Sequence, residues 1–225
     1  MGEHIMIYQV RLLKGLFTLE KSRYKLQNAE AVTHIGRNIV FLYVASLLLF
    51  CLYGFLGIGS ESFSKELVGL GESEFEMGKL LILAGNAVAG LIYPTVYLFL
   101  IALFVWALTD IAYLKVLIVQ MIIFIVQLLE KLLLLPFFVY LDINYDANPF
   151  SLGVISQYLV SQEYVIHLFS EITIFQVFVI AIQYYYLKKM TERNTYTLLA
   201  VIVLSYIAIW LLNALLAYVK VSVFV

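Results

Sequence analysis

The sequence is poor in cysteine, proline and charged residues, and each shortage excludes a class of protein. Its 225 residues include one cysteine and three prolines, and 13% of them are charged while 64% are hydrophobic. The lone Cys51 excludes an intrachain disulfide and a cysteine-based metal cluster. Soluble domains carry about 25% charged residues, so this chain is not an ordinary soluble domain.

Motifs of enzymatic chemistry are missing as well. The chain has no HExxH, GxSxG, Walker or CxxC pattern, so we expect neither enzymatic activity nor a cofactor. One weak metal candidate is the set Glu163, His167 and Glu171, which recur at four-residue spacing. On a helix the outer two lie about 12 Å apart, too far for one ion without ligands from other segments, such as Asp142 or Asp146. We therefore predict no metal site and keep the set as a candidate only.

What the chain has instead is long apolar runs. A membrane-spanning helix needs about 20 consecutive apolar residues, and five runs reach this length: residues 38–58, 80–108, 116–141, 164–187 and 196–219. We predict an all-α, five-helix transmembrane domain over residues 38–225, preceded by a cytoplasmic segment over residues 1–37. Pro94 lies in the middle of the second run and predicts a tilt or kink there.

The charges between the runs alternate in sign along the chain. Six basic residues precede the first run: Arg11, Lys14, Lys21, Arg23, Lys25 and Arg37. The next loop is acidic, the loop after the third run carries three acidic residues and no basic one, and the last turn carries Lys188, Lys189 and Arg193. Since basic segments stay on the cytoplasmic side, we predict an N-terminus inside and a C-terminus outside.

The N-terminal segment has the spacing of an amphipathic helix. Its apolar residues recur at helical intervals among the basic ones: Ile7, Val10, Leu13, Leu16 and Phe17. Two interpretations stay open. The helix lies in the interface of an anionic inner leaflet, held by the five basic residues from Arg11 to Lys25, or it packs on the protein's own inner face.

The lengths of the loops predict how the runs are paired. Short inner turns predict that the second and third spans form one hairpin and the fourth and fifth another. In the outer loop, Asn148 and Pro149 suit the start of a helix. We therefore predict a short surface helix over residues 149–160.

Polar residues inside the runs form the only candidate site. Glu130 and Lys131 lie about 18 and 16 Å from the outer end of the third run, where an ionisable group costs at least about 2.5 kcal/mol. Neighbours on a helix do not face each other, so each needs a partner on another helix. The predicted network consists of Asn86, Gln120, Gln127, Glu130, Lys131, Glu171, Gln176 and Asn213.

Depth in the membrane suggests how these residues pair. Glu171 lies about 12 Å from the outer end of its run, which predicts a contact between Lys131 and Glu171. Glu130 is then expected to meet Asn86, Gln127 or a water-filled cavity. Three roles stay open for the network: a lock on helix register, a pathway for protons, ions or a polar ligand, and a partner-binding site within the membrane.

Small residues in the second run predict close helix packing. Gly85 and Ala89 form a small-xxx-small pair, which allows the backbone of another helix to approach closely. We predict helix packing at Gly85, Ala89, Gly90 and Pro94.

Taken together, these features resemble the Yip1-domain family over about residues 78–220. The resemblance rests on the proline-interrupted run Leu91–Leu108, on Asn148–Gly153 (NPFSLG), on Glu171–Phe175 (EITIF) and on the short polar turn before the last run. The acidic-Tyr-Gly-Pro motif of eukaryotic members is absent before the first span. The resemblance therefore implies a bacterial-type member, an accessory membrane protein that assists ABC transporters or protects against membrane-active peptides.

We accordingly expect a non-enzymatic accessory or scaffold protein that crosses a bacterial cell membrane several times. Its expected partners are the anionic inner leaflet, an integral membrane protein such as a transporter subunit, and a second copy of the chain. No nucleic acid is expected, because the abundant aromatic residues fit a membrane-interface belt. The alternatives are a small transporter or proton conductor that uses Glu130, Lys131 and Glu171, and a metalloenzyme centred on His167 and Glu171. A hydrated cavity at Glu130 favours transport, whereas a closed polar core beside an apolar groove favours a scaffold.

Overall fold

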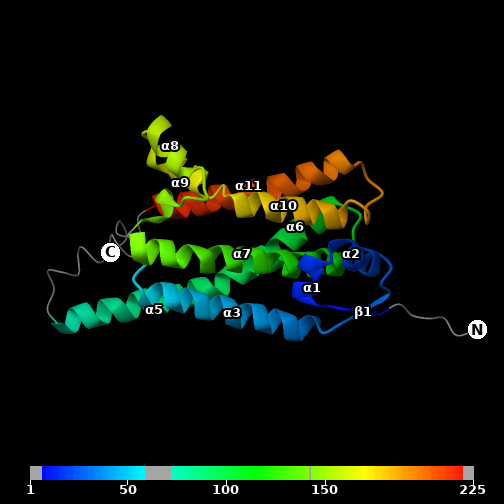
Figure 1. The fold of residues 1–225 in the computed structure, drawn as a ribbon, viewed down its shortest axis with the longest axis horizontal. Helices are drawn as coiled ribbons and strands as arrows, with labels where there is room; N and C mark the ends of the chain where they lie inside the picture. The colour runs from blue at the N-terminus through cyan, green and yellow to red at the C-terminus, as the bar shows by residue number, and fades with distance from the viewer. Residues whose placement is uncertain (1–6, 59–71, 142, 220–225) are drawn as a thin grey trace, which may run out of the picture.

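Four helices in the described part of the chain are long and apolar enough to cross a membrane. The computed structural model describes residues 7–58, 72–141 and 143–219. The first long helix is α3 (Ile35–Phe55) and the second is continuous through α5 (Glu72–Pro94), η1 (Thr95–Leu100) and α6 (Ile101–Leu108). The others are α7 (Tyr113–Leu141) and α11 (Thr195–Tyr218). They lie roughly along one direction (Figure 1), and they match the predicted runs 38–58, 80–108, 116–141 and 196–219.

The predicted span over residues 164–187 is not one helix. It consists of α9 (Glu163–Ser170) and α10 (Ile174–Leu187), separated by three residues. With 14 residues, α10 is about 21 Å long, shorter than the roughly 30 Å hydrocarbon core. The backbone of the break pairs with the preceding loop: Leu152 N–H donates to Ile172 O at 3.0 Å and Ile174 N–H to Phe150 O at 3.0 Å. The break is therefore hydrogen-bonded to another segment and is not a gap in the packing.

The N-terminal segment folds as two short helices between two short strands. Strands β1 (Ile7–Gln9) and β2 (Ala31–Thr33) pair in parallel, and α1 (Leu12–Phe17) and α2 (Leu19–Gln27) lie between them in the chain. Gly15 of α1 packs on α7 so closely that an added Cβ would come within 2.8 Å of the Ile122 side chain. The Tyr186 hydroxyl of α10 donates to Gly15 O at 2.7 Å. Of the two interpretations offered by the sequence, the structure has this segment packed on the protein's own helices.

The predicted surface helix of the outer loop is shorter than expected. It is α8 (Gly153–Leu159), preceded by the single turn η2 (Tyr145–Ala147). Asn148 does not cap α8. Its side chain accepts instead from Phe150 N–H at 2.9 Å and holds a turn.

The predicted pairing of the second run with the third and of the fourth with the fifth agrees with the helix contacts. The turns of these two hairpins lie at the end of the molecule away from α8 (Figure 1) and are bonded to each other. α6 packs against α7, and α10 packs against α11. Asp110, between α6 and α7, accepts hydrogen bonds from the Thr191 hydroxyl and from Glu192 N–H in the turn before α11. These two donors lower the pKa of the Asp110 carboxyl. Lys115 Nζ donates to Gln27 O at 2.6 Å and so fixes α2 to the same end.

Close packing in the second long helix occurs at Gly90 and not at Gly85. A Cβ on Gly90 would lie 3.0 Å from Phe50 Cβ and 3.1 Å from Leu47 Cα of α3, whereas a Cβ on Gly85 would meet nothing within 4 Å. The close packing predicted at Gly90 is therefore made with α3, whereas the close approach of another helix predicted at Gly85 is not made by any described part of this chain. The difference is one of helix face, because α3 lies on the Gly90 side of α5.

The kink predicted at Pro94 is a change of helix type. Pro94 ends α5, and the π-helical turn η1 follows it directly. A proline has no N–H for the carbonyl four residues before it, here that of Gly90. Ser46 Oγ of α3 donates to that carbonyl at 2.8 Å. A neighbouring helix thus satisfies the backbone group that the proline leaves open.

This pairing makes a testable prediction about stability. Ser46→Ala leaves the Gly90 carbonyl unpaired in an apolar setting, so we expect a loss of about 0.6–2 kcal/mol in the free energy of unfolding. In a Pro94→Ala background the restored N–H serves that carbonyl, and Ser46→Ala is expected to cost much less. Thermal unfolding of the four variants in detergent measures both effects. An equal cost of Ser46→Ala in the two backgrounds would contradict the assignment.

Candidate functional site

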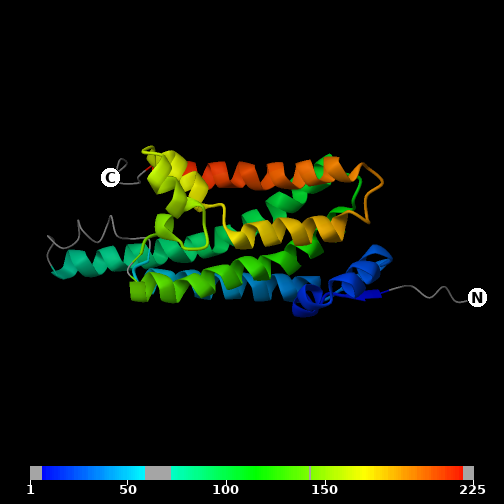
Figure 2. The same cartoon turned by 45° about the horizontal axis from the view of Figure 1, so that its top comes forward.

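The candidate site is a polar cluster within the helix bundle, near the loop that joins α7 to α9. It gathers Glu130 and Lys131 of α7, Glu171 and Thr173 of the break, Gln176 of α10 and Asn213 of α11. α10 lies between α7 and α11, so the break brings its polar residues toward both neighbours (Figure 2). We call these six residues the polar core.

Glu130 is held at the N-terminus of α10. The Thr173 hydroxyl donates to Glu130 Oε1, and Gln176 Nε2 donates to Oε2 at 3.4 Å. Thr173 is also the N-cap of α10, since its Oγ1 accepts from Gln176 N–H at 3.2 Å. A helix N-terminus carries a partial positive charge and favours a nearby carboxylate. The prediction that Asn86 or Gln127 pairs with Glu130 is therefore wrong, and Thr173 of the break and Gln176 of α10 are its partners instead.

Lys131 lies among aromatic rings and not beside a carboxylate. Its Nζ is 4.8 Å from the ring centre of Tyr93, 5.3 Å from that of Phe50 and 5.8 Å from that of Tyr145. An ammonium at this distance is attracted by the negative face of an aromatic ring. The cation thus faces aromatic residues of α3, α5 and η2.

The predicted direct contact between Lys131 and Glu171 is not formed. Among the described residues the ion pairs within 4.0 Å are Lys79–Glu76 and His167–Asp146. Glu171 Oε2 accepts instead from Asn213 Nδ2 at 2.9 Å, and the same amide lies 3.5 Å from the Tyr97 hydroxyl. Glu171 therefore connects the break to α11, and it interacts with Lys131 only electrostatically, through space.

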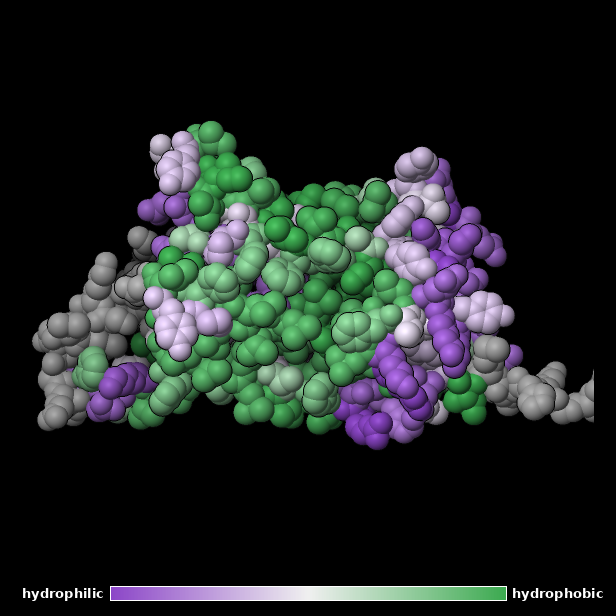
Figure 3. Space-filling model, viewed as in Figure 1, coloured by the Kyte–Doolittle hydropathy of each residue, from purple (hydrophilic) through white to green (hydrophobic). Residues whose placement is uncertain are grey.

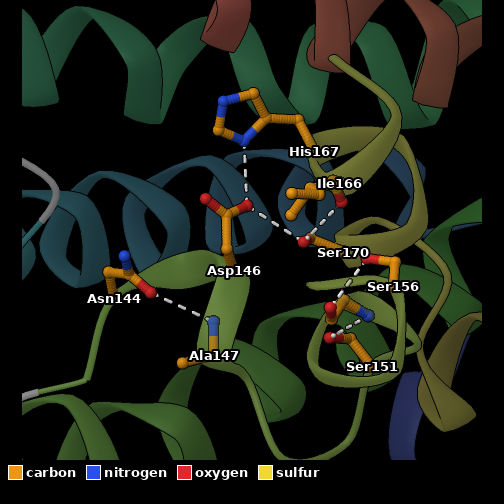
Figure 4. A network of polar contacts seen from close by, with 9 residues as sticks. Asn144, Asp146, Ala147, Ser151, Ser156, Ile166, His167 and Ser170 are labelled. Carbon is orange, nitrogen blue, oxygen red and sulfur yellow. Dashed lines mark hydrogen bonds and ion pairs between the residues drawn. The ribbon is translucent and has the colours of Figure 1, made fainter. Parts of the chain in front are cut away.

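A second polar network lies between η2, in the loop after α7, and α9. His167 Nδ1 is 2.8 Å from Asp146 Oδ1, and Ser170 Oγ donates to the same oxygen at 3.0 Å (Figure 4). The weak metal candidate is thereby divided, because His167 pairs with Asp146, Glu171 faces Asn213 and Glu163 is exposed. The described residues contain no group of three metal-ligating side chains.

Several predicted network residues lie outside the polar core. Asn86 donates to Ile82 O of its own helix at 3.0 Å and packs beside Gly54. Gln120 and Gln127 are buried on α7, and Gln120 Nε2 and both amide atoms of Gln127 find no protein partner among the described residues. They precede Glu130 on α7 and do not contact its carboxylate, so the structure brings together only part of the predicted set.

Thr173 of the polar core and the aromatic residues around the core escaped the sequence reasoning, although Thr173 carries a signal. Thr173 and Gln176 form the T-x-x-Q pattern of a capping box, which predicts a helix start inside the apolar run. Tyr93, Tyr97 and Phe50 carry no comparable signal, because aromatic residues are common throughout these helices.

The predicted basic residues lie on α1 and α2 or beside them. Arg11, Lys14, Lys21 and Lys25 are exposed, and Arg23 stacks on the Tyr185 ring with its guanidinium carbon 4.3 Å from the ring centre. Hydrophilic surface gathers at this end of the molecule, next to the hydrophobic surface over its middle (Figure 3).

Comparison of the chain with known protein families, with curated proteins and with solved structures gave no match. The fold itself defines the class, an all-α membrane protein with four long apolar helices and one broken helix.

Thr173 supports two interactions at once, which predicts a large effect of one substitution. Thr173→Val removes both the cap of α10 and a donor to Glu130, so we expect a loss of about 2–3 kcal/mol in the free energy of unfolding. Thr173→Ser keeps the hydroxyl and is expected to stay close to the native value. Thermal unfolding in detergent compares them, and a serine variant as unstable as the valine variant would refute the role of the hydroxyl.

Proposed function

We propose that the protein is a non-enzymatic accessory or scaffold protein of a bacterial cell membrane, which binds another integral membrane protein. The observation that supports this is the internal pairing of the polar core. Glu130 and Glu171 each accept from side chains within the bundle, and Lys131 lies against three aromatic rings. Buried polar groups that are paired within the bundle fix helix register. Their pairing does not require a bound substrate.

The outward face of α5 supports a docking role. Ala84 and Gly85 are exposed there together with larger apolar side chains, namely Leu81, Val88 and Ile92. α5 packs chiefly against α3 on its other face. Small residues on a free transmembrane face allow another helix to approach closely. The small-xxx-small pattern of the sequence thus fits contact with a partner helix better than contact within the chain.

The proposed topology and the family resemblance also support an accessory membrane protein. In the proposed arrangement α9 and α10 together complete a fifth crossing, with the N-terminus and the basic α10–α11 turn on the cytoplasmic side. The resemblance to the Yip1-domain family favours a partner such as an ABC transporter or a complex that resists membrane-active peptides.

Site-specific crosslinking in cells tests the proposal. A photoreactive residue at Val88 is expected to trap one membrane protein, whereas the same residue at Leu204 on the exposed face of α11 traps none. Gly85→Leu blocks the close approach and is expected to reduce the Val88 adduct at least about tenfold. Gly36→Leu, at a helical glycine that is equally free of contacts, serves as the matched control. Equal adducts at Val88 and Leu204, or a Val88 adduct unaffected by Gly85→Leu, would refute docking at α5.

A second candidate function, conduction of protons or ions, is favoured by the broken helix. Broken helices at membrane depth line the ion and substrate sites of many transporters, and here the break lies beside Glu130 and Glu171. If the protein conducts, purified protein in liposomes is expected to dissipate an imposed pH gradient. Glu130→Gln and Glu171→Gln then slow the flux, while Glu163→Gln at an exposed position does not. Flux equal to that of empty liposomes would exclude this function.

A further inference from the structure

A basic hollow and an apolar groove meet on the surface formed by α1, α2, α3 and α7. The hollow has a volume of about 770 Å³ and is lined by residues of β1, α1, α2 and the segments that join them, including Arg11, Lys14, Lys21 and Lys25. The groove has a volume of about 480 Å³ and is lined by α1, α3 and α7. Leu13 of α1 lines both, so the two depressions adjoin.

The hollow has the charge of an anion site. Four of its described lining residues are basic and none is acidic. Glu20 of α2 lines an adjoining depression, together with the basic Lys21 and Arg23. No carboxylate of the described residues lies within 4.0 Å of these four cations. Two large apolar side chains stand among them, since Phe17 is 85% exposed and Leu13 60% exposed. Exposed apolar side chains beside basic ones are typical of a surface that meets lipid headgroups.

The groove has the composition and length of a site for an acyl chain. Its lining is apolar throughout and includes Phe41, Ala45 and Leu48 of α3 and Leu128 and Leu129 of α7. It follows α3 from Phe41 to Leu52, a rise of about 16 Å. Half of the hydrocarbon core of a bilayer is about 15 Å thick. A groove of this length therefore fits the tail of a lipid in a single leaflet.

We propose that this surface binds one anionic phospholipid, with its phosphate in the basic hollow and an acyl chain in the groove between α3 and α7. The charge of the hollow selects an anionic headgroup, and the adjoining groove distinguishes a lipid from a free phosphate. The site depends on the docked position of α1, which Gly15 permits by its close approach to α7. It does not depend on partner docking at α5.

Native mass spectrometry of the purified full-length chain in detergent tests the site, with phosphatidylglycerol and phosphatidylcholine of identical acyl chains as probes. Phosphatidylglycerol is expected to bind at least about tenfold more tightly. Removing two lysines with Lys14→Ala/Lys21→Ala is expected to weaken its binding by about 25-fold, since each cation near a membrane surface contributes about fivefold. Lys188→Ala/Lys189→Ala removes the same charge from another part of this end and is expected to change the affinity less than twofold.

The groove is tested separately. Ala45→Phe fills it, and we expect weaker binding of both lipids with their ratio preserved. Leu48→Trp is a second filling variant at an exposed position, and thermal unfolding checks that each variant is folded. Equal retention of the two lipids, or an equal loss with the Lys188/Lys189 variant, would show a general charge effect and overturn the site. Displacement by millimolar inorganic phosphate, or no effect of both filling variants, would show an anion site without a lipid tail.

Discussion

The structure depends on the interaction between a buried carboxylate and the start of a helix. Glu130 lies in the middle of an apolar helix, where a charge without partners is costly. The N-terminus of α10 supplies a hydroxyl, an amide and a partial positive charge. The Thr173 hydroxyl has one donor and two acceptor positions: it donates to Glu130 and accepts from Gln176 N–H. A continuous helix over residues 164–187 has no free N-terminus at this depth, so the carboxylate and the break stabilise each other.

The need to pair every buried polar group also explains the interruption of the second long helix at Pro94. Within hydrocarbon every backbone polar group needs a partner inside the protein. At Pro94 the freed carbonyl of Gly90 accepts from Ser46, and at the α9–α10 break the backbone pairs with residues 150–152. Both interruptions lie beside the polar core, where Tyr93 faces Lys131 and Tyr97 lies near Asn213. The departures from regular helix thus occur where other segments can satisfy them, and they direct side chains toward the buried charges.

Apolar length predicted the long helices well, because a run of about 20 residues has one stable form in a membrane. It failed for residues 164–187, where hydrophobicity continues across the break and only the Thr173–Gln176 pattern marks a helix start. The depth of each residue along its helix predicted that Lys131 and Glu171 lie at a similar level in the membrane. It did not predict the direction in which each side chain points around its helix axis. Lys131 consequently faces Tyr93 and Phe50, while Glu171 turns to α11. Small residues likewise marked α5 as a packing helix without showing which face meets α3.

The distribution of charge follows from these internal pairings. The polar core matches its own charges through α10, α11 and aromatic rings, and Asp110 is engaged by the turn before α11. Among the described residues no carboxylate lies within 4.0 Å of the cations that line the basic hollow, where Arg11 donates to the neutral Gln9 and the lysines are exposed. Because α1 is docked on α7, these cations are fixed at the end of an apolar groove and do not move freely on a tether. Positive charge held beside apolar surface in this way is suited to an anionic amphiphile, in which a phosphate and a hydrocarbon tail are joined at a similar spacing.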